Sequence, residues 1–183
     1  MSAERNQLAV EPYRSYLLLL ARMQLDARQQ NKVEPSDVVQ VTLLEAHHKR
    51  QQFTGDEDGF IAWLRKALAN NIRDALRQMW RQKRDVNRER SLEAALEQSS
   101  ERLGACLAAA GSSPSRQAVR NEDLLRLSDA LLALSDAQRE AVVRHHLQGW
   151  TLSEVAAHLD RTDAAVAGLL HRGLRRLREI MNG

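Results

Sequence analysis

Apolar residues recur along this chain at steps of three and four, and almost no stretch alternates apolar with polar residues. This spacing is typical of α-helices with one buried face, whereas the strands of a half-buried sheet would alternate. Only 3 prolines and 8 glycines interrupt the pattern in 183 residues. The pattern therefore predicts an all-α protein.

Three helices are predicted in the first part of the chain. Between residues 13 and 25, apolar residues fall on nearly every side, as expected for a helix buried by several neighbours. Pro35 stands where a first helical residue would, before "SDVVQVTLLEAHH". After the break "TGDEDG", a long helix begins near Phe60, and only Asn71 interrupts its apolar face.

The pattern loosens from about residue 87 to 120. Gly104 and the stretch "GSSP" give this segment the composition of a linker, although "LEAALEQ" favours a helical turn or two. Helical spacing returns after it and continues to the end. We therefore predict two small helical domains joined by a flexible linker, divided as 1–88, 89–120 and 121–183.

Local signals punctuate the second domain. Ser135 is expected to be an N-cap with Gln138 reaching back to it, and Thr151 with Glu154 is expected to form a capping box. Gly149, between them, is typical of a residue that ends a helix. These positions predict short helices separated by tight turns.

Composition excludes several classes of protein. The chain is 43% apolar and 28% charged, which is enough apolar sequence for a real core. No apolar run approaches the roughly 20 residues of a membrane span, and no signal peptide is visible. Cys106 is the single cysteine, so no intramolecular disulfide can form. A cytoplasmic protein is expected.

Catalytic and cofactor chemistry has little support in the sequence. The adjacent histidines at 47–48 and at 145–146 point to different sides of a helix, so neither pair is suited to one metal ion. No glycine-rich phosphate loop is present. We therefore expect no enzyme activity, no catalytic residue, no cofactor, no metal and no small-molecule substrate.

One face of the long helix is basic. It lies beside Trp63 and Trp80 and carries Lys66, Asn70, Arg73, Arg77, Arg81 and Arg84. Cations with flat side chains beside them suit a phosphate backbone whose bases are unstacked. An ordinary solvated face with two core tryptophans is an equally weighted alternative at this point.

The stretch 151–178 has the length and punctuation of a helix-turn-helix. A helix at 152–158, the turn "LDR", an N-cap at Thr162 and a following helix that continues through Gly173 fit that motif, with Val166 packing back. Asp160 stands where glycine is usual, and aspartate tolerates the left-handed conformation. The arginines in "HRGLRRLRE" suit phosphates but carry no sequence information. A plain helical hairpin is the alternative.

Both halves together resemble bacterial RNA polymerase sigma factors of the extracytoplasmic-function (ECF) group. "SDVVQVTLLEAHH" is similar to the family's core-polymerase-binding helix, although Val41, Leu43 and His47 replace its usual Glu, Phe and Trp. "FTGDEDGFIAWLRKALANNIRDALR" resembles its promoter-melting segment, and the stretch 130–178 resembles its fourth region. The motifs occur in the family's order.

The resemblance implies partners and sites. Core polymerase is implied to bind, through the β′ clamp, at Asp37, Gln40 and Leu44. The separated strand of the −10 element is implied to contact Thr54, Gly55, Trp63, Lys66, Asn70, Arg73 and Arg77. The −35 element is implied to contact Thr162, Asp163, Val166, His171, Arg172, Arg175 and Arg176. The β flap and an anti-sigma protein are further implied partners, and the linker is implied to follow the RNA exit path.

The expected recognition helix of the helix-turn-helix is unusually apolar. Ala167 and Leu169 replace the Lys and Arg common there in the family. Tethering to polymerase raises the effective concentration of this helix at the promoter, so weak binding of the helix to DNA is sufficient. The competing hypothesis is a stand-alone helix-turn-helix regulator that acts without polymerase. It requires a dimer surface or a receiver domain, and neither pattern is visible in the sequence.

Overall fold

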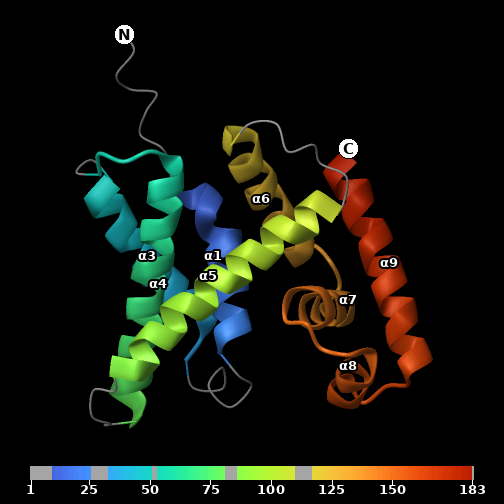
Figure 1. Ribbon diagram of the computed structural model, residues 1–183. Helices are drawn as coiled ribbons and strands as arrows, with labels where there is room; N and C mark the ends of the chain where they lie inside the picture. The colour runs from blue at the N-terminus through green and yellow to red at the C-terminus, as the bar shows by residue number, and fades with distance from the viewer. Residues whose placement is uncertain (1–9, 26–32, 51–52, 81–85, 110–116, 183) are drawn as a thin grey trace. The chain divides into compact units, whose positions relative to one another are not determined.

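The computed structural model describes residues 10–25, 33–50, 53–80, 86–109 and 117–182. Regular structure in these ranges is helical throughout and includes no strand (Figure 1). This confirms the all-α prediction. The chain forms two compact units, 1–97 and 98–183, which are described separately below.

The first unit is built around α1 (Arg14–Gln24), which follows a short 3-10 turn at Glu11–Tyr13. Five of its residues, Tyr16, Leu17, Leu19, Leu20 and Ala21, are buried. They lie on several sides of the helix because both α3 (Pro35–Lys49) and α4 (Glu57–Trp80) pack against it. The prediction of a helix surrounded by neighbours is confirmed.

Local chemistry sets the starts of α3 and α4. Pro35 occupies the first turn of α3, as predicted, where its missing N–H leaves no hydrogen bond unmade. Asp56 precedes α4, and its Oδ1 accepts a hydrogen bond from the Gly59 N–H at 2.9 Å. Capping by Asp56 fixes where the long helix begins, a few residues before the predicted Phe60.

Asn71, the polar interruption on the apolar face of α4, is explained by contacts with α3. Its Nδ2 donates to Thr42 Oγ1 at 3.0 Å and lies 3.2 Å from Glu45 Oε2. Thr42 is fully buried and itself donates to the Val38 carbonyl at 2.8 Å. Buried polar groups are normally hydrogen-bonded, and the bonds from Asn71 satisfy its amide while joining α4 to α3.

Helix α5 (Val86–Ala109) is much longer than the turn or two predicted from "LEAALEQ". Leu96 in the first unit and Leu103 in the second are both fully buried. Each unit therefore includes part of α5 in its core. The stretch 110–116, which includes the "GSSP" of the predicted linker, lies outside the described residues.

The second unit contains α6 (Gln117–Leu132), α7 (Asp136–Val142), the π-helical segment η4 (Val143–Leu147), α8 (Leu152–Leu159) and α9 (Asp163–Asn182). Helix α9 packs against α6, α7 and α8. At Gly173, α9 lies close to α7, and an added Cβ would lie 3.0 Å from Val142 Cγ2. Glycine at this position allows α9 to lie against α7.

Most of the predicted turn chemistry is confirmed. Thr151 and Glu154 form the reciprocal capping box, and Asp160 is left-handed with φ 52°. Gly149 follows η4 with φ 77°. Ser135 is the N-cap of α7, but the predicted side-chain box with Gln138 is wrong, because no side-chain capping bond forms there. None of the helices in the described ranges is long and apolar enough to cross a membrane.

Candidate polymerase and nucleic-acid interfaces

One face of α3 is exposed and partly apolar. Asp37, Gln40, Val41 and Leu44 lie on it, and we call this set the α3 docking face. The side facing the core carries Val38, Val39, Thr42, Leu43 and Ala46. Among the described residues, Val41 and Leu44 are the large apolar side chains that remain exposed, at 51% and 55%. Such residues close together indicate a surface for a partner.

Val41 was not among the predicted site residues. The sequence marked it only as a departure from the family's usual Glu. The structure places it beside the predicted Asp37, Gln40 and Leu44, so all three predicted residues share one surface with it. The helical spacing of these positions was the signal that could have identified it.

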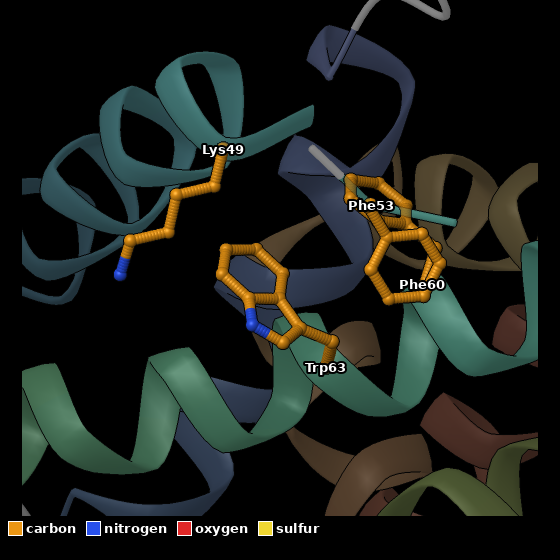
Figure 2. A pocket seen from close by; sticks show the side chains of 4 residues that line it. All are labelled: Lys49, Phe53, Phe60 and Trp63. Atoms are coloured by element: carbon orange, nitrogen blue, oxygen red, sulfur yellow. The ribbon is translucent and has the colours of Figure 1, made fainter. Parts of the chain in front are cut away.

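A pocket of about 190 Å³ lies where the end of α3 meets the start of α4. Its walls are Lys49, Phe53, Phe60 and Trp63, and we call it the aromatic pocket (Figure 2). The rings of Phe60 and Trp63 are stacked at 5.9 Å, and Phe53 meets Phe60 edge-on at 5.4 Å. Lys49 Nζ lies 5.9 Å from the centre of the Trp63 ring. The pocket thus combines flat apolar walls with one cation.

The loop between α3 and α4 is shaped by Phe53. A Cβ at Gly55 would lie 2.6 Å from Phe53 Cζ, so a side chain at that position would displace the ring from the pocket wall. Thr54 and Gly55, both predicted site residues, are exposed beside the pocket. The predicted Trp63 is half-buried and forms one wall. The structure therefore brings these three predictions together.

Two of the cations on the basic face of α4 are paired with other side chains of the same unit, which the sequence did not indicate. Lys66 and Asn70 are exposed, as expected. Arg73, however, donates to Asn70 Oδ1 at 2.8 Å and lies 3.9 Å from Glu93 of α5. Arg77 is paired with Asp74 at 3.2 Å. Arg81, Arg84 and the side chain of Trp80 lie outside the described residues.

The helix-turn-helix is assembled as predicted, with one correction. Thr162 caps α9 by accepting a hydrogen bond from the Ala165 N–H at 3.2 Å. Ser153 of α8 donates to Asp163 Oδ2 at 2.9 Å, which ties the two helices together. The prediction that Val166 contacts DNA is wrong, because its side chain is fully buried.

The outer face of α9 carries the remaining predicted residues. His171, Arg172, Arg175 and Arg176 are exposed. Arg175 and Arg176 both pair with Glu179, at 3.7 and 3.1 Å. No ion pair of Arg172 with an acid is present among the described residues. Leu170 is buried, so only Leu169 of the two leucines is partly accessible.

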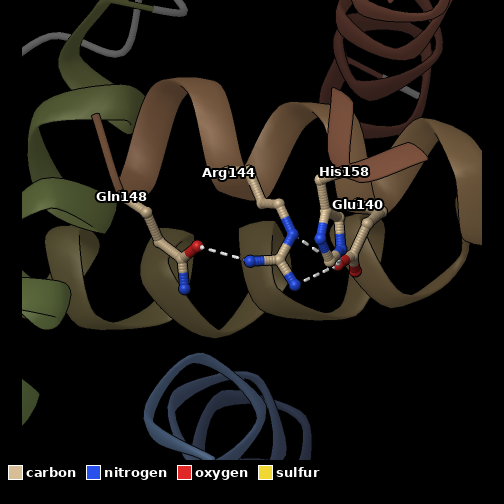
Figure 3. Close-up of polar contacts among 4 residues, drawn as sticks. All are labelled: Glu140, Arg144, Gln148 and His158. Atoms are coloured by element: carbon tan, nitrogen blue, oxygen red, sulfur yellow. Dashed lines mark hydrogen bonds and ion pairs between the residues drawn. The ribbon is translucent and has the colours of Figure 1, made fainter. Parts of the chain in front are cut away.

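A polar cluster joins α7 and η4 to the first helix of the motif (Figure 3). Glu140 accepts a hydrogen bond from Arg144 Nε at 2.6 Å and lies 3.3 Å from His158 Nε2 of α8. Arg144 also donates to Gln148 Oε1 at 3.3 Å. Its guanidinium lies 4.5 Å from the centre of the Trp150 ring, which meets His158 edge-on.

This cluster was not foreseen, because Glu140 and His158 are far apart in the sequence. The contact of His158 with Glu140 joins α8 to α7, and α9 packs against both helices. The neighbouring His145 lies 2.7 Å from the Trp150 carbonyl through Nδ1. Burial, together with the nearby His145, lowers the pKa of His146. No metal-binding group of three or more ligands occurs among the described residues.

A helix-turn-helix with exposed arginines, preceded by a separate helical unit with an aromatic pocket, is typical of a DNA-binding protein. Comparison with known proteins makes the class specific. Residues 11–82 match Sigma-70 region 2, and residues 124–177 match Sigma-70, region 4. RNA polymerase sigma factor CarQ of Myxococcus xanthus is 31% identical over 147 residues, which cover 79% of this chain and 73% of that protein.

The chain belongs to the sigma-70 family, in its ECF group. It is a sigma factor, which binds core RNA polymerase and directs promoter recognition and transcription initiation. Its partners are core polymerase and promoter DNA. The hypothesis of a stand-alone regulator is not favoured, because it does not explain why residues 11–82 match Sigma-70 region 2.

Proposed function

We propose that each unit performs one part of promoter recognition. Residues 1–88 dock on the β′ clamp and hold the melted −10 strand, and residues 121–183 contact the −35 element and the β flap. Residues 89–120 connect them along the RNA exit path. The observation that carries the proposal is the aromatic pocket, which lies in the first unit next to exposed Thr54 and Gly55.

The aromatic pocket is proposed to hold a base flipped out of the −10 element. Unstacking a base costs a few kcal/mol, and stacking on an aromatic side chain returns about 1–3 kcal/mol. Trp63 provides such a surface, and Lys49 beside it provides a charge for the adjoining phosphate. Lys66 and Asn70, exposed further along α4, extend the track for the strand.

The α3 docking face is proposed to contact the β′ clamp. Two exposed apolar side chains, Val41 and Leu44, are flanked by the polar Asp37 and Gln40. An apolar centre with a polar rim is typical of protein–protein interfaces. Burying Val41 and Leu44 favours association, while Asp37 and Gln40 fix the orientation.

Helix α9 is proposed to lie in the major groove of the −35 element. Thr162, Asp163, His171, Arg172, Arg175 and Arg176 are the predicted contacts that remain exposed. In this scheme the chain is not an enzyme, because polymerase performs the chemistry. It acts in the cytoplasm, where polymerase and promoter DNA are found, and an anti-sigma protein is a further proposed partner.

Association with core polymerase tests the docking proposal. The wild-type chain is mixed with bacterial core enzyme and followed by gel filtration, together with the Asp37→Ala, Gln40→Ala double variant and Leu44→Asp. Both variants are expected to lose co-elution, because each alters the α3 docking face without touching the core. The double variant Glu122→Ala, Asp129→Ala on exposed positions of α6 is the matched control. Wild-type co-elution of Leu44→Asp would contradict the proposal.

A further inference from the structure

We propose that Gly168 is a positioning residue that determines where the Arg172 guanidinium meets promoter DNA. The inference rests on the proposed contact between α9 and the −35 element. It assigns a role to the glycine that lies between Ala167 and Leu169 in the helix expected to contact DNA. It also names the side chain through which that residue acts.

The buried residues of α9 define which way the helix faces. Val166, Leu170, Gly173 and Leu177 are buried against the rest of the unit. At 3.6 residues per turn, Gly168 falls on the side opposite to them, one turn before Arg172. Gly168 is partly exposed and Arg172 is exposed, in agreement with that position. Both residues therefore lie on the surface that is available to DNA.

The Arg172 guanidinium lies against the place where a Cβ at residue 168 would be, so an added methyl group would shift the guanidinium by a few tenths of an ångström. A Cβ at residue 168 would lie 3.2 Å from Arg172 Nη1, 3.6 Å from Nη2 and 3.7 Å from Cζ. Long side chains in a helix point toward its N-terminus, so Arg172 extends back over the preceding turn. All three of the nearest atoms belong to this one guanidinium.

This arrangement explains why glycine is useful at an exposed helical position, where it is normally less favourable than alanine. With no Cβ at residue 168, the guanidinium lies over the preceding turn of α9, and its planar set of donors is placed toward the N-terminal half of the helix. Bidentate contacts to base edges or phosphates depend on such geometry. Arg175 and Arg176 instead share Glu179.

A double-mutant cycle with the complete holoenzyme tests the inference. Binding to a −35 duplex and to duplexes with each single base pair changed is measured for wild type, Gly168→Ala, Arg172→Ala and the double variant. Gly168→Ala is expected to raise Tm, because alanine favours the helix, yet to weaken promoter binding about five- to tenfold and to alter the base preference. In the Arg172→Ala background, Gly168→Ala is expected to have no further effect on DNA.

Each other outcome has a defined meaning. Unchanged DNA binding by Gly168→Ala would overturn the inference. An equal loss of DNA binding in the presence and absence of the Arg172 side chain would also overturn it, because glycine would then act by letting the backbone approach DNA. The Arg175→Ala, Arg176→Ala variant separates this from the proposed function. If it weakens binding while Gly168→Ala does not, only the inference fails. If no arginine of α9 affects binding, the −35 proposal itself fails.

Discussion

The two long helices expected to face DNA, α4 and α9, differ in how their cations are held. On α4, Arg73 and Arg77 contact Asn70, Asp74 and Glu93, and the distinctive feature is the aromatic pocket at the start of the helix. On α9, Arg172, Arg175 and Arg176 are all exposed, although the last two pair with Glu179. Charge alone does not distinguish the helices in the sequence. The first unit is therefore expected to depend on stacking and shape, and the second on charge.

Trp63→Ala is expected to have the largest effect, because it removes the flat wall of the aromatic pocket. Loss of one stacked base corresponds to about 1–3 kcal/mol, which is a decrease in open-complex formation of about five- to 150-fold. Permanganate reactivity of thymines in the −10 element, measured with holoenzyme, reports this step.

Trp63→Phe keeps a ring at the same position and serves as the control, with opening expected to be near that of wild type. Binding to an isolated −35 duplex is expected to be unchanged in both variants. Normal opening by Trp63→Ala would contradict the assignment of the pocket to a base.

Val166→Ala tests which side of α9 faces DNA. The side chain is fully buried, so removing two methyl groups is expected to lower the free energy of unfolding of the second unit by about 2 kcal/mol. Urea denaturation followed by circular dichroism measures the loss. The base preference at the −35 element is expected to stay the same. A changed preference with unchanged stability would restore Val166 as a DNA contact.

The fold was largely predictable from the sequence, because its signals are local. The spacing of apolar residues located most of the helices, although it missed the length of α5. Pro35 marked the start of α3, and Thr151 with Glu154 marked the start of α8. Asp160 was correctly expected to be left-handed, since few other residues tolerate that conformation. Each of these features depends on residues within a turn of one another.

The site was predictable only in part, because its details depend on long-range contacts. The pairing of Arg73 with Glu93, and of Glu140 with His158, joins residues on different helices. The burial of Val166 depends on how α9 packs against the rest of the unit. A helical pattern shows which residues share a face, but it does not show which face is covered.

The salt dependence of binding should distinguish the cations of the two helices. The side chain of Arg175 is 67% exposed and lies 3.7 Å from Glu179, whereas that of Arg77 is 33% exposed and lies 3.2 Å from Asp74. Arg175→Ala is expected to reduce the slope of log K against log salt by about 0.9, the value for one duplex phosphate contact. Arg77→Ala is expected to change the slope less. Titrations of holoenzyme with a promoter fragment containing both elements measure both slopes, and equal changes would contradict the contrast between α4 and α9.

The smallest expected effect is a dependence of stability on pH that is confined to the second unit. Burial and the neighbouring His145 lower the pKa of His146. The unfolded chain therefore binds more protons than the folded chain near the ordinary histidine pKa, and stability falls as pH decreases through that range. In the first unit, burial and the charge of Glu57 raise the pKa of Tyr13 to about 12, so Tyr13 does not change the stability of that unit near the ordinary histidine pKa. Thermal unfolding at about pH 7.5 and about pH 5.5 should show a lower Tm at the acidic value. His146→Gln should reduce that difference, and an unchanged difference in this variant would assign the pH dependence to another group.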